Sequence, residues 1–179
     1  MPKKLVVALL LAITFVGAIL IVISMVRKNE AVVYNESYIW HAETDRAGST
    51  GVLVRGRKIH HIKNDLNKLV FALNKVVADS EAARAQGDGV KTEFPRIKVR
   101  KIEQQTVFVQ IENDQYLTES MGSSGAQDYL AEVTYTLTEN PGIKSIDFVF
   151  PAGDHAMPGL YTRESFADYR TVIDDGRRR

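Results

Sequence analysis

One long apolar run near the start of the chain limits how the chain can fold more than any other feature. Residues 5–26 are apolar apart from Thr14, Gly17 and Ser24. As a helix at ~1.5 Å per residue, the run would extend roughly 33 Å and cross a hydrocarbon core of ~30 Å. It has no polar face, which a surface helix of a globular domain would show. We therefore expect residues 1–28 to form a transmembrane anchor, with the lipid bilayer as the partner of residues 5–26.

The residues around this run favour an uncleaved anchor over a cleaved signal peptide. A signal peptide has an apolar stretch of roughly 7–15 residues and a small-residue cleavage site, whereas this run is longer and ends in Ser-Met-Val-Arg-Lys. Basic residues flank both ends, so the positive-inside rule does not decide the orientation by itself. We expect a single-pass protein of a bacterial cytoplasmic membrane, with a short tail inside and the C-terminal domain extracytoplasmic.

The composition of the chain excludes several kinds of site. None of the 179 residues is a cysteine, so disulfides, thiolate metal ligands and a lipid anchor on cysteine are excluded. All the charged side chains before residue 30 are basic, which leaves the remainder with a small excess of acidic side chains. Such a balance does not steer a domain towards nucleic acid. We expect no nucleic-acid partner.

Residues 36–170 show the pattern of one α+β domain that follows a polar linker at 29–35. Strand-like alternation of apolar residues occurs in five segments, namely 36–42, 52–59, 96–103, 106–111 and 146–150. Apolar residues recur at steps of three and four in two expected helices, one from Ile62 to near Gly87 and one from Ala126 to Leu137. The order ββαββαβ predicts a mostly antiparallel sheet with two helices packed on one face. Residues 171–179 are expected to form a frayed tail.

A helix, a stop and a buried strand follow one another near the C-terminal end. Ser124, with Gln127 three residues later, is expected to cap the second helix. Pro141 cannot continue that helix, and Gly142 allows the turn after it. The string that joins helix to strand is Thr136-Leu137-Thr138-Glu139-Asn140-Pro141-Gly142-Ile143. It resembles the Thr-Leu-Thr-x-x-Pro-Gly-Val-like turn of the GerMN domain family of spore germination and sporulation proteins.

Two further stretches carry the same resemblance, which extends over about residues 100–165. Residues 107–111 sit where the family has a Val-x-Val-Asp-hydroxyl strand, with Glu112 one position off in place of the Asp. Residues 153–159 resemble the family's Gly…Pro-Gly ending. The resemblance implies a sheet backed by two helices, and similarity to the ring-building modules of spore channels and secretion systems. Together with the expected anchor, it implies a membrane-anchored, non-enzymatic interaction or assembly module of the cell envelope, linked to sporulation or germination, that contacts a protein partner or its own copies.

A ladder of basic residues is the first candidate interaction surface. Arg96, Lys98 and Arg100 alternate with apolar residues, so the three cations share one face of a strand. Such a face either blocks unwanted strand pairing or contacts an acidic partner, anionic lipid or a wall polymer. Phe108 lies opposite the apolar face of the next strand and is the aromatic expected at an interface, whereas the other aromatics, Phe71 included, are expected in the core.

The loop before the second helix is the other candidate surface. Ser123 and Ser124 lie between two glycines at the expected helix N-terminus, where free amides either hold an anion or are simply capped. The alternative function is therefore an extracytoplasmic binding module for an anionic ligand or a wall polymer.

Two short histidine clusters raise the question of chemistry. His60 and His61 are adjacent on a strand and point to opposite faces, so they cannot ligate one zinc ion together without distortion. Asp154 and His155 could orient a base for Ser123 or Ser124, but the sequence has no Gly-x-Ser-x-Gly elbow. We expect no catalytic, metal or cofactor site, and keep an envelope hydrolase that uses Asp154 and His155 as the second alternative.

Overall fold

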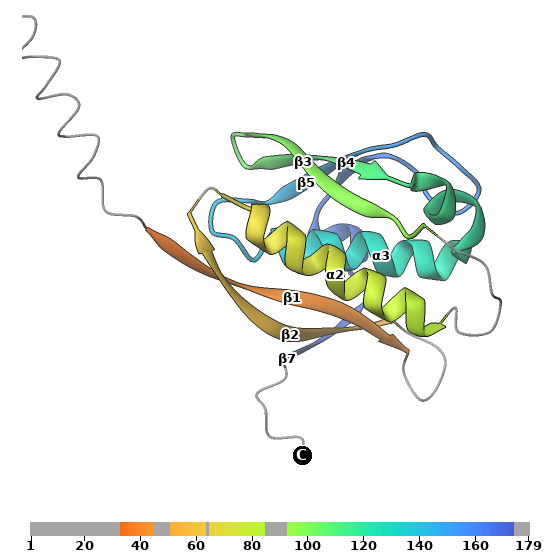
Figure 1. Cartoon of the computed structure of the whole chain (residues 1–179), viewed down its shortest axis with the longest axis horizontal. Coiled ribbons are helices and arrows are strands. Elements are labelled where there is room, and N and C mark those ends of the chain that lie inside the picture. Colours follow the sequence, from red (N-terminus) through yellow and green to blue (C-terminus); the bar gives the residue numbers. More distant parts are fainter. Residues whose placement is uncertain (1–32, 45–50, 64, 85–92, 174–179) are drawn as a thin grey trace, which may run out of the picture. The chain divides into compact units, whose positions relative to one another are not determined.

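The computed structural model describes residues 33–44, 51–63, 65–84 and 93–173 (Figure 1). The expected anchor at 1–28, and the linker as far as residue 32, lie outside these residues. Among the helices that are described, none has the length and apolar character needed to span a bilayer. The chain from Tyr34 onwards forms one compact unit.

The described strands form two separate sheets. The first has the order β1–β2–β7, with β1 at Tyr34–Thr44, β2 at Gly51–Ile62 and β7 at Arg170–Ile173. The second has the order β3–β4–β5–β6, with β3 at Arg96–Glu103, β4 at Thr106–Glu112, β5 at Ser145–Val149 and β6 at Gly159–Tyr161. The α+β class is therefore confirmed, but the prediction of one sheet is wrong.

The prediction of mostly antiparallel pairing needs a similar correction. The pairs β1–β2, β3–β4 and β5–β6 are antiparallel, whereas β2–β7 and β4–β5 are parallel. Parallel pairing follows when the connection between two neighbouring strands crosses over the sheet. A helix in that connection returns the chain to the end where the first strand began, so both strands run in the same direction. The helix between β4 and β5 is such a crossover.

Two helices, α2 (Asn67–Arg84) and α3 (Gly122–Leu137), lie between the two sheets in Figure 1. Both helices contact strands of both sheets, so they do not pack on one face of a single sheet as expected. Each apolar stripe is buried in the shared core. The largest fully buried side chains come from both sheets and both helices and include Ile39, Leu53, Leu69, Leu73, Leu137, Ile146 and Phe148.

The predicted helix starts are wrong for local reasons. Ile62 was expected to begin the first helix and its buried stripe. It is instead the last residue of β2 and is 45% exposed, so the helix begins only at Asn67. Phe71, expected in the core, is 72% exposed on α2. The second helix begins at Gly122 without a side-chain cap. The N-cap is Met121, and Gly122 has a φ of 75°, so Ser124 lies inside the first turn of α3 and not at its cap; a π-helical turn at Tyr116–Ser120 precedes the helix.

The predicted helix stop is confirmed, and the chain then adds two strands, β6 and β7, that the sequence pattern does not predict. Helix α3 ends at Leu137, and Gly142 has a φ of 92°, which favours glycine. After β6, a 3₁₀ turn at Arg163–Phe166 leads to β7 at 170–173, where a frayed tail was expected to begin at 171. Residues 174–179 lie outside the described chain.

Candidate functional site

The candidate interaction surface is the side of the second sheet whose side chains point away from the buried core. We call it the outer sheet face. Along β4 and β5, buried residues alternate with more exposed ones, which is the pattern of a sheet covered on one side. The outer sheet face consists of Arg96, Lys98, Arg100, Lys101, Glu103, Thr106, Phe108, Gln110, Glu112, Asp147, Val149 and Leu160.

The three predicted cations lie together on this face, and each has an acceptor on β4. Arg96 Nη2 is 3.5 Å from one Glu112 oxygen and Lys98 Nζ is 3.8 Å from the other. Arg100 Nη2 donates to the Gln110 side-chain oxygen over 3.1 Å. Exposed ion pairs of this kind contribute only about 0.2–1 kcal/mol to stability. The cations thus remain available to a partner.

A β-bulge brings a fourth cation onto the face, which strict alternation does not predict. The register shifts between Val99 and Lys101, so that Lys101 pairs with Phe108 instead of facing the core. Its Nζ lies 4.4 Å from the centroid of the Phe108 ring, a cation–π contact. Alternation alone would place Lys101 on the same side as Val99, and nothing in the sequence marks the bulge.

Apolar side chains continue the face across β5 and β6. Phe108 is half-buried and pairs with Asp147, which in turn pairs with Leu160. Leu160 is 64% exposed, and Val149 beside this row is 46% exposed. Alternation with the buried Ile146 and Phe148 could have identified Val149. Leu160 was missed because β6 has only three residues.

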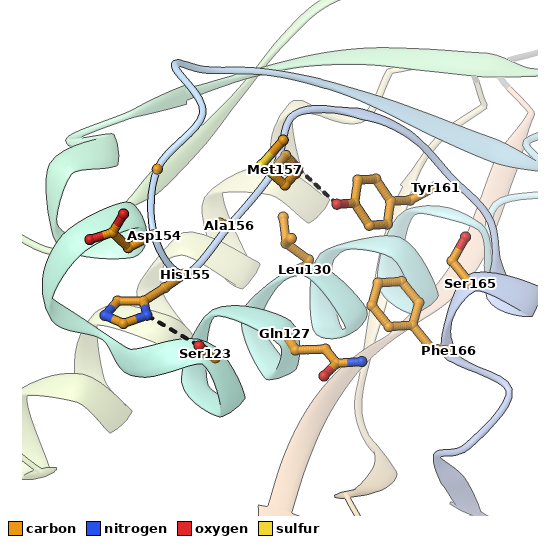
Figure 2. Close-up of a pocket in the computed structure, with 11 residues that line it drawn as sticks. Ser123, Gln127, Leu130, Asp154, His155, Ala156, Met157, Tyr161, Ser165 and Phe166 are labelled. Carbon is orange, nitrogen blue, oxygen red and sulfur yellow. Dashed lines mark hydrogen bonds between the residues drawn. The ribbon is translucent and has the colours of Figure 1, made fainter.

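The second predicted site lies elsewhere, at the start of α3, and its residues separate into two groups. Ser123 Oγ and His155 Nδ1 are 3.2 Å apart, and both line a cavity together with Asp154 (Figure 2). Ser124 is exposed and does not line this cavity. The structure therefore joins Ser123 to the Asp154–His155 turn but leaves Ser124 outside.

The Ser123–His155 contact lacks the third group of a catalytic triad. In a triad, a carboxylate accepts from the histidine nitrogen that does not face the serine. Within the described residues, His155 has no hydrogen bond or ion pair to a carboxylate, and Asp154 is not bonded to it. The arrangement resembles a polar rim more than a charge-relay system.

The other histidines behave as expected from their positions on one strand. His61 is buried, and its Nε2 lies 2.9 Å from the Ser37 hydroxyl, whereas His60 is exposed and lies 3.4 Å from a Glu36 oxygen. The two rings thus lie on opposite faces of β2. Over the described ranges, no group of three histidine or carboxylate side chains is placed to hold a metal ion.

One family model matches more than half of the chain. A family model described as "Germane: Sporulation and spore germination" matches residues 44–150. Among solved structures, the chain is similar to the tandem GerMN domains of the sporulation protein GerM from Bacillus subtilis, at 13% sequence identity and a TM-score of 0.41. That match covers 73% of this chain and 45% of the other, so this chain spans less than half of that structure. Curated protein sequences gave no match.

The family model covers more than half of the chain, from the end of β1 to just past β5. This range includes both helices and the helix-stop signature at 136–143, which first indicated the family. The chain therefore belongs to the Germane family, the GerM-type domains of sporulation and spore germination.

Proposed function

We propose that this chain is a membrane-anchored, non-enzymatic interaction module of the bacterial cell envelope, linked to sporulation, that docks a protein partner on the outer sheet face. The link to sporulation rests on the family. The anchor rests on the apolar run at residues 5–26, which has the length of a membrane span. The proposal includes the orientation in which the short N-terminal tail is inside and the C-terminal domain lies on the extracytoplasmic side.

The observation that carries the docking proposal is one continuous row across the second sheet. Lys101, Phe108, Asp147 and Leu160 are successive neighbours on four strands. Protein interfaces commonly combine an apolar or aromatic centre with a polar rim. Here Phe108 and Leu160 supply apolar surface on either side of Asp147. The four cations of β3 outnumber the two carboxylates that pair with them, Glu103 and Glu112, and supply a rim with a basic excess. A partner with acidic side chains around an apolar patch is complementary to it.

Strand addition at β1 is a poor alternative to face-to-face docking. At the edge of β1 that faces away from β2, side chains of α3 already accept backbone N–H groups. At the edge of β3, Asn74 of α2 bonds both the N–H and the C=O of Ile97. A partner strand at these positions would have to displace existing hydrogen bonds. The outer sheet face requires no such displacement.

Two matched variants test the docking face in the full-length, membrane-bound chain. Phe108→Asp places a charge at the centre of the face, and Phe71→Asp places the same charge at an exposed phenylalanine on α2. Loss of an interface centre typically costs at least 2 kcal/mol, so we expect the affinity for the partner or for a second copy to fall by at least about 10-fold in Phe108→Asp only. Equal retention of the partner by both variants would refute the proposal.

The anchor is tested separately. Full-length protein is expected to stay in the membrane pellet after carbonate extraction, and protein from which residues 1–28 have been deleted is expected to be released. Release of the full-length protein would contradict the anchor without affecting the docking face.

A further inference from the structure

A cavity at the N-terminal half of α3 is separate from the outer sheet face and shares no residue with it. Its volume is about 340 Å³, which falls within the usual range of small-ligand sites, roughly 300–1,000 Å³. Its walls come from α3, the 153–157 loop, β6 and the 3₁₀ turn after it. Segments distant in the sequence therefore form it together.

The cavity has a polar end and an aromatic end (Figure 2). Ser123, Asp154 and His155 form the polar end. Tyr161 and Phe166 form the other end, where their rings are stacked with centroids 5.8 Å apart and planes inclined by 19°. The Tyr161 hydroxyl donates to the Met157 carbonyl over 2.8 Å, which holds the ring in place. Leu130 lies between the two ends.

Several polar groups around the cavity have hydrogen-bonding capacity that the described residues do not use. The side chains of Gln127 and Asp154 make no hydrogen bond within that part of the chain, and His155 uses only its Nδ1. These groups include donors and acceptors within one small space. A ligand with several hydroxyl groups could bond to all of them.

The charges around the cavity select against anions. Among the described residues that line it there is no lysine or arginine, and Asp154 is the single carboxylate. An anionic ligand would meet repulsion and find no cationic partner. The apolar wall formed by Leu130, Met157 and Tyr161 suits a ligand that also presents one apolar face. Ser123, Gln127 and Met157 are exposed, so the cavity opens to solvent and a polymer chain can continue out of it.

From this combination we propose that the cavity binds an uncharged, hydroxyl-rich sugar unit of a polysaccharide. The sugar hydroxyl groups bond to Gln127, Asp154 and His155, and the C–H face of the ring lies on Leu130 and Tyr161. This site adds a glycan contact to the protein contact on the outer sheet face. It does not depend on that contact, because the two surfaces have no residue in common.

Titration of the detergent-solubilised full-length chain with chitotetraose, a neutral oligosaccharide, tests this proposal. We expect saturable binding that Ser123→Phe abolishes by filling the polar end. Gln127→Ala is expected to weaken binding by about 3- to 10-fold, the loss typical of one neutral hydrogen bond. Gln110→Ala, on the outer sheet face, is the matched control and should bind as the unmodified chain does.

Two further probes separate the sugar from other occupants. Trigalacturonic acid, an acidic oligosaccharide, and tetra-alanine, a peptide, are both expected to bind at least 10-fold more weakly than chitotetraose. Tighter binding of either probe would overturn the assignment. Absence of chitotetraose binding, or undiminished binding in Ser123→Phe, would also overturn it. All these results are independent of whether Phe108→Asp loses its protein partner.

Discussion

The Thr136 hydroxyl of α3 accepts the backbone N–H of Trp40 over 2.9 Å, at an edge of β1 that no strand covers. Four residues earlier on the helix, Glu132 Oε1 accepts the N–H of Ala42 over 2.7 Å. Four helical residues advance about 6 Å and two strand residues about 6.7 Å, so the two spacings nearly match. Helix α3 therefore takes the place of a missing strand and satisfies backbone groups that would otherwise be buried without partners.

Thr136→Val tests this role because it keeps the shape of the side chain and removes the acceptor. We expect the free energy of unfolding to fall by about 1–3 kcal/mol, the cost of leaving a buried donor unsatisfied. Urea unfolding followed by the fluorescence of Trp40, the single tryptophan, measures it. Thr134→Val is the matched control, since Thr134 is also fully buried but its hydroxyl has no partner among the described residues. Equal destabilisation by both variants would exclude a specific role for Thr136.

Glu139 is expected to be more important for stability than other ion-pairing carboxylates of the domain. Its oxygens lie 3.0 Å from Arg55 Nη2, 3.4 Å from Arg163 Nη2 and 3.0 Å from Trp40 Nε1, and its side chain is only 12% exposed. Glu139→Gln removes the charge that both guanidinium groups contact, and we expect a loss of about 1–3 kcal/mol in urea unfolding.

Glu112→Gln provides the comparison for Glu139. Glu112 also contacts two cations, but its side chain is 40% exposed. Solvent screens such pairs, so this substitution is expected to cost less than about 1 kcal/mol. A loss at Glu112 as large as that at Glu139 would contradict the argument from burial.

Stability is expected to decline in alkali because burial raises the pKa of the Tyr129 phenol well above its usual range. Below pH about 10 the phenol is neutral in both the folded and the unfolded chain, and its full contribution to stability is present. Above that pH only the unfolded phenol ionises, so stability falls by about 1.4 kcal/mol per pH unit. Urea unfolding between pH 8 and pH 11 should show a shallower decline for Tyr129→Phe. At pH 8 this variant should be at least as stable as the unmodified chain, because no described residue bonds the Tyr129 hydroxyl.

Gly51→Ala is expected to release the C-terminal strand. A Cβ atom at Gly51 would overlap the ring of Tyr169, whose hydroxyl donates to Asp128 over 2.6 Å just before β7 begins. Displacement of the ring breaks this bond and weakens the pairing of β7 with β2. Amide hydrogen exchange at residues 170–173 should therefore accelerate. Tyr169→Phe loses the bond without the overlap, and a larger effect there than in Gly51→Ala would contradict this explanation.

Local signals predicted the elements that depend on local physics. The tight turn at Gln104 and Gln105 is present, and the helix stop before Pro141 is confirmed with Gly142 in a positive-φ conformation. The prediction that Ser124 caps the second helix is wrong because α3 begins at Gly122, with a φ of 75°, and Ser124 lies inside its first turn. Lys101 was not among the predicted cations of the face, because a bulge shifts the alternation by one residue.

The sequence by itself determined the order of the five strands and two α-helices up to residue 150, and the family to which they belong, because periodicity and turn residues act over a few neighbours. Only the tertiary structure decided that the strands form two sheets with the helices between them. It also decided that the Thr136 hydroxyl completes the edge of β1, and that Ser123 and His155 meet beside a cavity. These outcomes depend on pairing between residues 32 to 96 positions apart, which local patterns do not encode.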